Sequence, residues 1–159
     1  PVMNDERKPH AAEHSVEIQL PFLQVALGSF PFVPVVMGSQ DWRSCEAVAG
    51  AIARAARGKN VLVVGSSDLS HFHDYEKARR LDQSVVDLVG NRDARGLARR
   101  LEDGTSEACG GGPIVTAMRI AEKSGALGAK VLRYANSGDV TGDRRQVVGY
   151  LSAAFFRES

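Results

Sequence analysis

Several features that would identify a common protein class are scarce in this chain of 159 residues. It has two cysteines, Cys45 and Cys109, which are too few for a disulfide framework, so a reducing cytoplasm is the expected location. Its 20 Lys and Arg nearly balance its 19 Asp and Glu, which argues against a nucleic-acid partner. No apolar run approaches the ~18 residues of a membrane span, and no signal peptide is visible. We therefore expect no membrane partner.

The remaining composition is that of an ordinary globular protein, with 43% hydrophobic and 25% charged residues. The length suits a single domain over residues 1–159, in which the polar residues 1–12 form a loop. The chain opens at Pro1 without an initiator methionine, which favours a processed product or a fragment.

Alternating helix and strand patterns predict an α/β fold with three layers and a mixed, mainly parallel sheet. Residues 61–64 are four consecutive apolar residues, typical of a strand that is covered on both faces. Asp41, Asp74 and Asp93 each precede an apolar helical stripe and can cap a helix. Further helices are expected at residues 16–27 and from Pro113, and further strands at residues 32–37, 130–135 and 146–155, the last two antiparallel.

The polar segment after residues 61–64 is the first candidate site, because ligands bind beyond the carboxyl ends of strands in open α/β sheets. Asp68 lies close enough in sequence to orient His71, and a neutral imidazole can move protons at physiological pH. The alternative is a polar turn whose Ser and Asp side chains satisfy backbone groups. We favour a functional role for His71 over His73, which is predicted to lie on the surface.

Cys109 is the second candidate, because three glycines follow it before a predicted helix. The start of a helix favours the thiolate form that binds metal, and exposed glycine N–H groups can hold an anion. The alternative is a flexible turn with an inert thiol. Glu13 and His14 could form a pocket wall, but from the residues alone we favour capping of a helix by Ser15. Cys45 lies on an apolar helical face and is predicted to be in the core.

Taken together and in this order, these segments resemble the Memo family, called AmmeMemoRadiSam system protein B in bacteria and archaea. The resemblance runs from Glu13 to Phe155 and ends with the strand VVGYLSAAF. The family fold is similar to that of class III extradiol dioxygenases, which are non-haem iron enzymes that open catechol rings. The matching stretches are EHSVEIQLPFL (13–23), VPVVMG (33–38), VLVVGSSDLSHF (61–72), EACGGGPI (107–114) and YANSGDV (134–140).

The resemblance implies roles for individual residues. His71 matches the acid/base histidine of the dioxygenases, and Cys109 matches the position of the metal-binding thiolate of Memo proteins. Asp68 matches a residue that lines the same pocket, and we expect it to be catalytic together with His71. Other residues expected to line this pocket are Glu13, His14 and Ser67. Studied family members bind iron or copper and have redox activities, which implies Fe(II) or Cu as the cofactor of the full-length protein.

One large part of the family pattern is absent. Family members carry two further histidine ligands in PHAGY-like and GPSHH-like motifs, and neither motif occurs here. The chain therefore looks like the C-terminal part of a member, with N-terminal strands missing from a dioxygenase-like sheet. We expect no bound cofactor in this chain alone, and oligomerisation through the exposed sheet edge.

Two functional hypotheses follow, and a third is that the fragment has no activity of its own. The first is a dioxygenase-like metal pocket with redox or oxygenase chemistry on a small molecule. The alternative is a non-catalytic ligand- or protein-binding module of the AmmeMemoRadiSam system. If His71 and Cys109 share one pocket, their side chains should lie roughly 4–9 Å apart.

Overall fold

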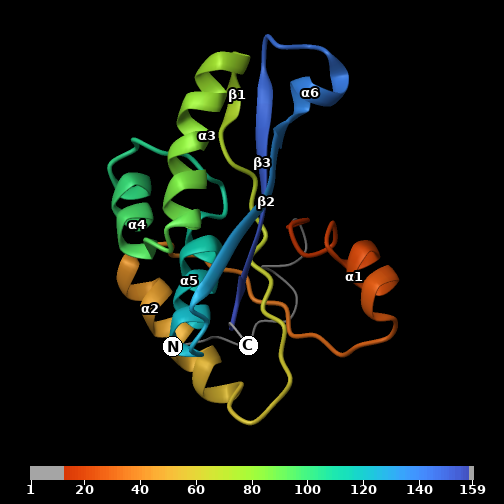
Figure 1. The fold of residues 1–159 in the computed structure, drawn as a ribbon, viewed down its shortest axis with the longest axis vertical. Helices are drawn as coiled ribbons and strands as arrows, with labels where there is room; N and C mark the ends of the chain where they lie inside the picture. Colours follow the sequence, from red (N-terminus) through yellow and green to blue (C-terminus); the bar gives the residue numbers. More distant parts are fainter. Residues whose placement is uncertain (1–12, 158–159) are drawn as a thin grey trace. The chain divides into compact units, whose positions relative to one another are not determined.

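The computed structural model describes residues 13–157 (Figure 1). The chain divides into two compact units, Pro1–Gly38 and Ser39–Ser159, and the prediction of one domain over 1–159 stays a prediction. The loop predicted for residues 1–12 lies outside the described residues. In the first unit, α1 (Leu20–Leu27) begins with a proline in its first turn. The helix expected from residue 16 therefore begins later, at the place where Pro21 can start it.

The second unit is a mixed α/β structure. Its three strands form a sheet of order β1-β3-β2 in which both pairs are antiparallel. The antiparallel pairing predicted for the last two strands is confirmed. The elements are α2 (Trp42–Ala55), β1 (His71–His73), α3 (Tyr75–Gly90), α4 (Ala94–Glu102), α5 (Gly111–Lys123), β2 (Gly128–Asn136), α6 (Ser137–Thr141) and β3 (Val147–Phe156).

Aspartate caps start three of these helices, as predicted. In each case the carboxylate accepts a backbone N–H of the first turn, which would otherwise have no partner. The bonds are Ser44 N–H to Asp41 at 3.0 Å, Lys77 N–H to Asp74 at 3.0 Å and Gly96 N–H to Asp93 at 2.7 Å.

The sheet differs from the prediction. Between residues 13 and 157 no parallel strand pair occurs, so a mainly parallel sheet and a three-layer arrangement are not confirmed. The strands predicted at residues 32–37 and 61–64 are wrong, because neither segment joins a ladder. The physical reason is that a strand needs a neighbouring backbone for its N–H and C=O groups, and apolar composition alone does not supply one.

The core lies between the sheet and the helices. Helix α3 packs on β2 and β3, and α5 packs against α2 and α4, so helices α2 to α5 lie on one side of the β2–β3 ribbon (Figure 1). Cys45 is completely buried in α2, which confirms its predicted core position. Within residues 13–157, no helix is both long and apolar enough to cross a bilayer.

Candidate metal-binding site

The site forms where the segment before β1 meets the loop before α5. The backbone N–H of Cys109 donates to the carbonyl of Asp68 at 3.3 Å. In return, the N–H of Asp68 points at the Cys109 sulfur, 3.3 Å away. This reciprocal contact joins two segments that are 41 residues apart in sequence. A cysteine sulfur binds metal in its thiolate form.

Three potential ligand atoms converge at this contact. One side-chain atom each of Asp68, His71 and Cys109 lie within 4.8 Å of one another. The His71 Nε2 atom lies 3.4 Å from an Asp68 carboxylate oxygen. The structure therefore brings His71 and Cys109 into one site, as the sequence analysis expected. The Asp68 and His71 side chains are half-exposed, so a ligand can reach them.

A buried carboxylate that the sequence analysis missed fixes the start of β1. Asp82 of α3 is completely buried. It accepts the backbone N–H of Ser70 at 3.0 Å and the hydroxyl of Tyr134 at 2.7 Å. Burial and the neighbouring Asp82 raise the pKa of Tyr134, so its hydroxyl remains a donor. Asp82 thus holds the backbone between Asp68 and His71 in place.

A sequence signal for Asp82 did exist. It stands four residues after Ala78 and three before Val85 on the buried stripe of its helix. A carboxylate on an apolar stripe must find hydrogen-bond partners inside the protein, because an unpaired buried charge is costly.

The Cys109 loop is held by Gln40, a second residue that the sequence analysis missed. Its side-chain nitrogen donates to the Cys109 carbonyl at 3.1 Å, and its side-chain oxygen accepts the Gly112 N–H at 2.7 Å. The only local signal was its position just before the cap residue Asp41. The two bonds span 69 and 72 residues of sequence, and sequence spacing does not reveal such contacts.

The glycine N–H groups are not free to bind an anion, so that reading of the triglycine is wrong. The Gly110 N–H donates to the Ser67 hydroxyl at 2.8 Å, and the Gly111 N–H donates to the Ala108 carbonyl at 3.2 Å. The Gly112 N–H donates to the Gln40 side-chain oxygen, as described above. Ser67, predicted to line the pocket, thus supports the loop, and its hydroxyl lies 3.8 Å from the Cys109 sulfur.

The glycines before and at the start of α5 are needed for close packing. A Cβ atom on Gly110 would lie 2.7 Å from the Ser66 carbonyl oxygen, and one on Gly112 would lie 2.8 Å from the Gln40 Cβ. Real Cβ atoms do not approach so closely. The N-terminal turn of α5 can therefore rest on these neighbours only because it lacks side chains.

A second histidine ties the two site segments together. The His73 Nε2 atom lies 3.0 and 2.8 Å from the two carboxylate oxygens of Glu107. The His73 side chain is half-buried, with 21% of its surface exposed, so its predicted surface position is confirmed only in part. Between the two histidines, Phe72 adopts a left-handed φ of 60°, which is uncommon for a residue with a side chain. The strained residue thus lies inside the site segment.

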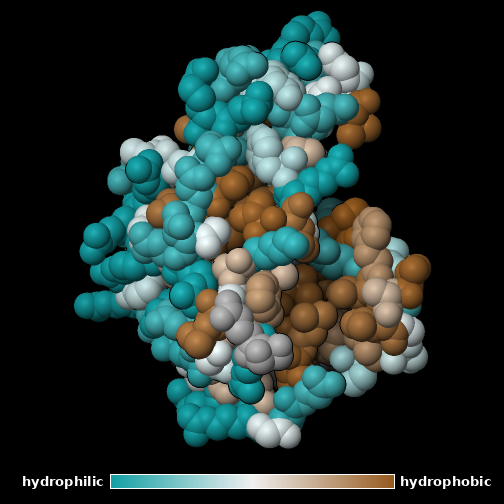
Figure 2. Space-filling model, in the orientation of Figure 1, coloured by the Kyte–Doolittle hydropathy of each residue, from teal (hydrophilic) through white to brown (hydrophobic). Residues whose placement is uncertain are grey.

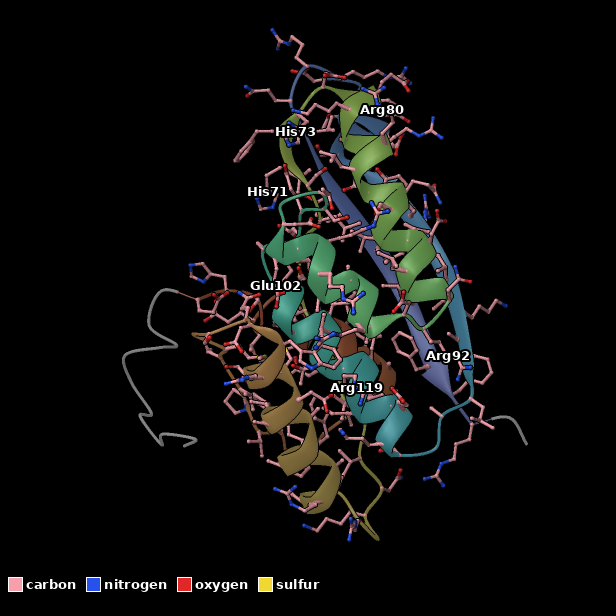
Figure 3. All side chains as sticks on the ribbon, turned by 90° about the vertical axis from the view of Figure 1, so that its left-hand side faces the viewer. His71, His73, Arg80, Arg92, Glu102 and Arg119 are labelled. Carbon is pink, nitrogen blue, oxygen red and sulfur yellow. The ribbon has the colours of Figure 1, made fainter. Side chains whose placement is uncertain are left out.

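A cavity of about 630 Å³ opens beside these groups. His71 and Cys109 line it, together with the carboxyl-bearing residues Asp41, Glu102 and Glu107. Figure 3 labels His71, His73 and Glu102, which lie on the same side of the second unit. No lysine or arginine lines the cavity among the residues that the structure describes, so its walls are acidic or neutral.

Glu13 and His14 belong to the first unit, where only their local contacts are described. The Glu13 carboxylate accepts the Ser15 N–H at 2.8 Å, and this bond lowers the pKa of Glu13. His14 pairs with Glu17 at 2.8 Å on an exposed surface. Their predicted place in the pocket stays a prediction.

Substitutions of Gln40 should separate its two hydrogen bonds. In Gln40→Ala the Gly112 amide loses its acceptor, and we expect it to exchange with deuterium about tenfold faster or more. Gln40→Glu keeps that acceptor but loses the donor to the Cys109 carbonyl. It should keep the Gly112 protection while lowering the free energy of unfolding by about 1–3 kcal/mol. Equal exchange rates of the Gly112 amide in Gln40→Ala and in the wild type would contradict the role of Gln40 in holding the Cys109 loop.

The sequence is similar to known proteins along nearly all of its length. The family model described as Memo-like protein matches residues 1–154. A MEMO1 family protein of Methanopyrus kandleri is 38% identical, and the match covers 98% of this chain and 56% of the relative. A MEMO1 family protein of Sulfolobus acidocaldarius is 39% identical, and the match covers 97% of this chain and 55% of the relative. A MEMO1 family protein of Thermotoga petrophila is 36% identical, over 92% of this chain and 52% of the relative. The chain spans little more than half the length of these curated relatives.

Proposed function

Because the chain belongs to the Memo family, we propose that it carries a metal-binding pocket for redox or oxygenase chemistry on a small molecule. The observation that carries this proposal is the convergence of Asp68, His71 and Cys109, whose ligand atoms lie within 4.8 Å of one another. Cys109 supplies the metal-binding thiolate. His71 holds and moves a proton, and Asp68 orients its imidazole from 3.4 Å.

The chemistry of these donors fits a transition metal. Sulfur and nitrogen ligands bind such ions at about 2.0–2.3 Å, so atoms that share an ion lie roughly 3–4 Å apart. Small rotations from the observed separations are therefore sufficient. A mixed set of nitrogen, oxygen and sulfur donors suits Fe(II) or Cu, with the thiolate shifting the preference toward copper. When bound, such an ion supplies a redox-active Lewis acid with open positions.

The protein's own residues would act around that centre. The Asp68 and Ser67 contacts hold the Cys109 loop, so the thiol is placed before any ligand arrives. The acidic and neutral cavity wall favours a neutral or cationic small molecule over an anion. For the whole domain we propose the three-layer, dioxygenase-like fold of the family, in a cytoplasmic protein of the AmmeMemoRadiSam system.

The second candidate is a non-catalytic module that binds a ligand or a protein. It is favoured by the roles assigned above, since Cys109 alone is a metal ligand there while His71 and Asp68 handle a proton. Stable metal sites use three or four ligands. In such a module the 630 Å³ cavity would hold its ligand without turnover.

Metal titration of the intact chain distinguishes the candidates. After treatment with a chelator, the chain is titrated with Fe(II) under anaerobic conditions, and with Cu(II) and Zn(II). We expect weak, reversible binding, because the ligand shell offered by this chain is incomplete, and a thiolate-to-copper absorption band should accompany Cu(II). Absence of any metal-dependent signal would favour the binding module. Tight stoichiometric binding would reveal metal ligands beyond the Cys109 thiolate.

A further inference from the structure

Two side chains beside the metal site have no part in the function proposed above. They are His73, the last residue of β1, and Glu107, which stands two residues before Cys109. We propose that His73 and Glu107 are positioning residues, and that the hydrogen bond between them holds the His71 imidazole beside the Cys109 thiol. This inference rests on the proposed function, because it concerns the same two groups.

The geometry of the pair favours a positioning role over a chemical one. The His73 Nε2 atom lies 3.0 and 2.8 Å from the two Glu107 carboxylate oxygens, so both oxygens face the same ring nitrogen. Among the residues that the structure describes, neither His73 nor Glu107 belongs to the group of possible metal ligands. Glu107 also lines the cavity, so a direct role as a ligand is the alternative that the experiment must exclude.

The bond between His73 and Glu107 completes a frame around the two site groups. At one end of the frame is the reciprocal contact of Asp68 and Cys109. At the other end, His73 stands two residues after His71, and its partner Glu107 comes from the Cys109 loop. Two segments that are joined at two places cannot swing about a single contact. The second connection therefore fixes the direction of the His71 side chain relative to the sulfur.

Each side of this bond is itself anchored. His73 pairs with Val147 of β3, which is completely buried. Ser106, the neighbour of Glu107, is also buried, and its hydroxyl lies 2.9 Å from the hydroxyl of Ser84 in α3. The bond therefore connects the sheet to a loop segment that is attached to α3.

The backbone of Phe72 shows that the segment needs such a restraint. Its left-handed φ of 60° is unfavourable for a residue with a side chain and persists only where the surroundings hold it. The Phe72 side chain is 68% exposed, so its own burial does not hold it. The β1–β3 register shifts between His71 and His73, so the strand ladder is interrupted at this residue.

Apolar packing does not supply the restraint either. In the view of Figure 2, the surface around α6 and the start of α3 is mainly hydrophilic. The Phe72 ring lies 5.5 Å from the His71 ring, so a relaxation of Phe72 toward an extended backbone would also move the imidazole. The bond from His73 to Glu107 opposes that relaxation.

The first test removes the bond from the intact chain in the absence of metal. His73→Ala and Glu107→Ala should each speed deuterium exchange of the Cys109 amide about tenfold or more, because this N–H bonds to Asp68 only while the two segments stay together. The double variant should exchange no faster than either single variant, since both remove the same bond. Glu76→Ala removes an exposed carboxylate from the first turn of α3 and should exchange like the wild type. Wild-type exchange in both alanine variants overturns the proposal.

Conservative variants distinguish positioning from a general loss of stability. Glu107→Gln keeps an acceptor oxygen for His73, and His73→Gln keeps a donor nitrogen for Glu107. Both should restore wild-type exchange of the Cys109 amide and keep the thiolate-to-copper band in a Cu(II) titration. The alanine variants should bind Cu(II) about tenfold or more weakly, as for other contacts that orient a ligand. If Glu107→Gln loses the band as Glu107→Ala does, the carboxylate is a ligand and the proposal is overturned.

The exchange measurement decides this inference even if the wild type shows no copper band, a result that would contradict the proposed function alone. If an alanine variant does not fold, the wild-type chain supplies the test. A nuclear Overhauser effect between the His73 ring and the Glu107 side chain is expected, and its absence overturns the proposal.

Discussion

Replacing Asp82 with alanine is expected to lower the free energy of unfolding by about 3 kcal/mol. The substitution leaves the buried Ser70 N–H and the Tyr134 hydroxyl without their shared acceptor, and each orphaned group costs about 1–3 kcal/mol. It also leaves a void beside Gly149, because a Cβ atom on that glycine would overlap the carboxylate. Urea denaturation followed by circular dichroism measures the change.

Two variants test the physical reason for this loss. Asp82→Asn keeps the size of the side chain and one acceptor oxygen, and the Tyr134 hydroxyl can turn to accept a hydrogen bond from the amide. Its free energy of unfolding should therefore fall by only about half as much as that of Asp82→Ala. Asp87 lies on the same helix but is exposed, and Asp87→Ala should stay within about 0.5 kcal/mol of the wild type. A wild-type midpoint for Asp82→Ala would mean that the carboxylate contributes nothing to the position of β1.

Replacing Cys109 with alanine should abolish metal-dependent signals while leaving stability almost unchanged. Loss of one outer contact of a metal site already costs about 10–100-fold in affinity, so loss of a ligand should cost on the order of 100-fold or more. The Cys109 side chain is exposed, so its removal creates no cavity, and unfolding should shift by less than about 0.5 kcal/mol. Isothermal titration with Zn(II) and urea denaturation measure the two effects.

The second cysteine provides the matched control. Cys45 is completely buried and its sulfur lies 3.5 Å from the Gly112 carbonyl. Burial raises the pKa of the Cys45 thiol, which keeps it protonated and unable to compete as a ligand. Cys45→Ala should therefore keep the metal affinity and lose about 1–2 kcal/mol of stability. A Cys45→Ala protein that no longer binds metal, or a Cys109→Ala protein that still does, would reverse the assignment.

Local signals in the sequence were sufficient for the helices. Asp41, Asp74 and Asp93 each form the predicted cap, because a cap depends only on residues within one turn. Strands depend on a distant neighbour. The long pair β2 and β3 was predicted because both partners lie within 30 residues and carry apolar patterns, whereas residues 61–64 have the pattern without the partner. The three-residue strand β1 is too short and polar to show a period of two.

The residues of the site also fall into those that local sequence spacing predicts and those that it does not. Asp68 and His71 stand three residues apart, so their pairing could be predicted from sequence. Their approach to Cys109 was expected from the resemblance and the general geometry of α/β sheets. Gln40, Glu107 and Asp82 were missed, because each acts on a segment between 12 and 72 residues away. Packing, and not spacing, decides such contacts.

The hydrogen bonds from Gln40 to the Cys109 loop have a consequence for folding kinetics. Bringing these groups together closes a loop of 69 residues, and the Asp68–Cys109 contact closes one of 41. Contacts of such high sequence separation form late in folding, because the chain must lose the conformational entropy of a long loop before the contact can stabilise the fold. We therefore expect Cys109 to join the local Asp68–His71 pair late in folding. In refolding experiments, a thiolate–metal absorption should rise with the slowest phase, after the helical circular dichroism has already recovered.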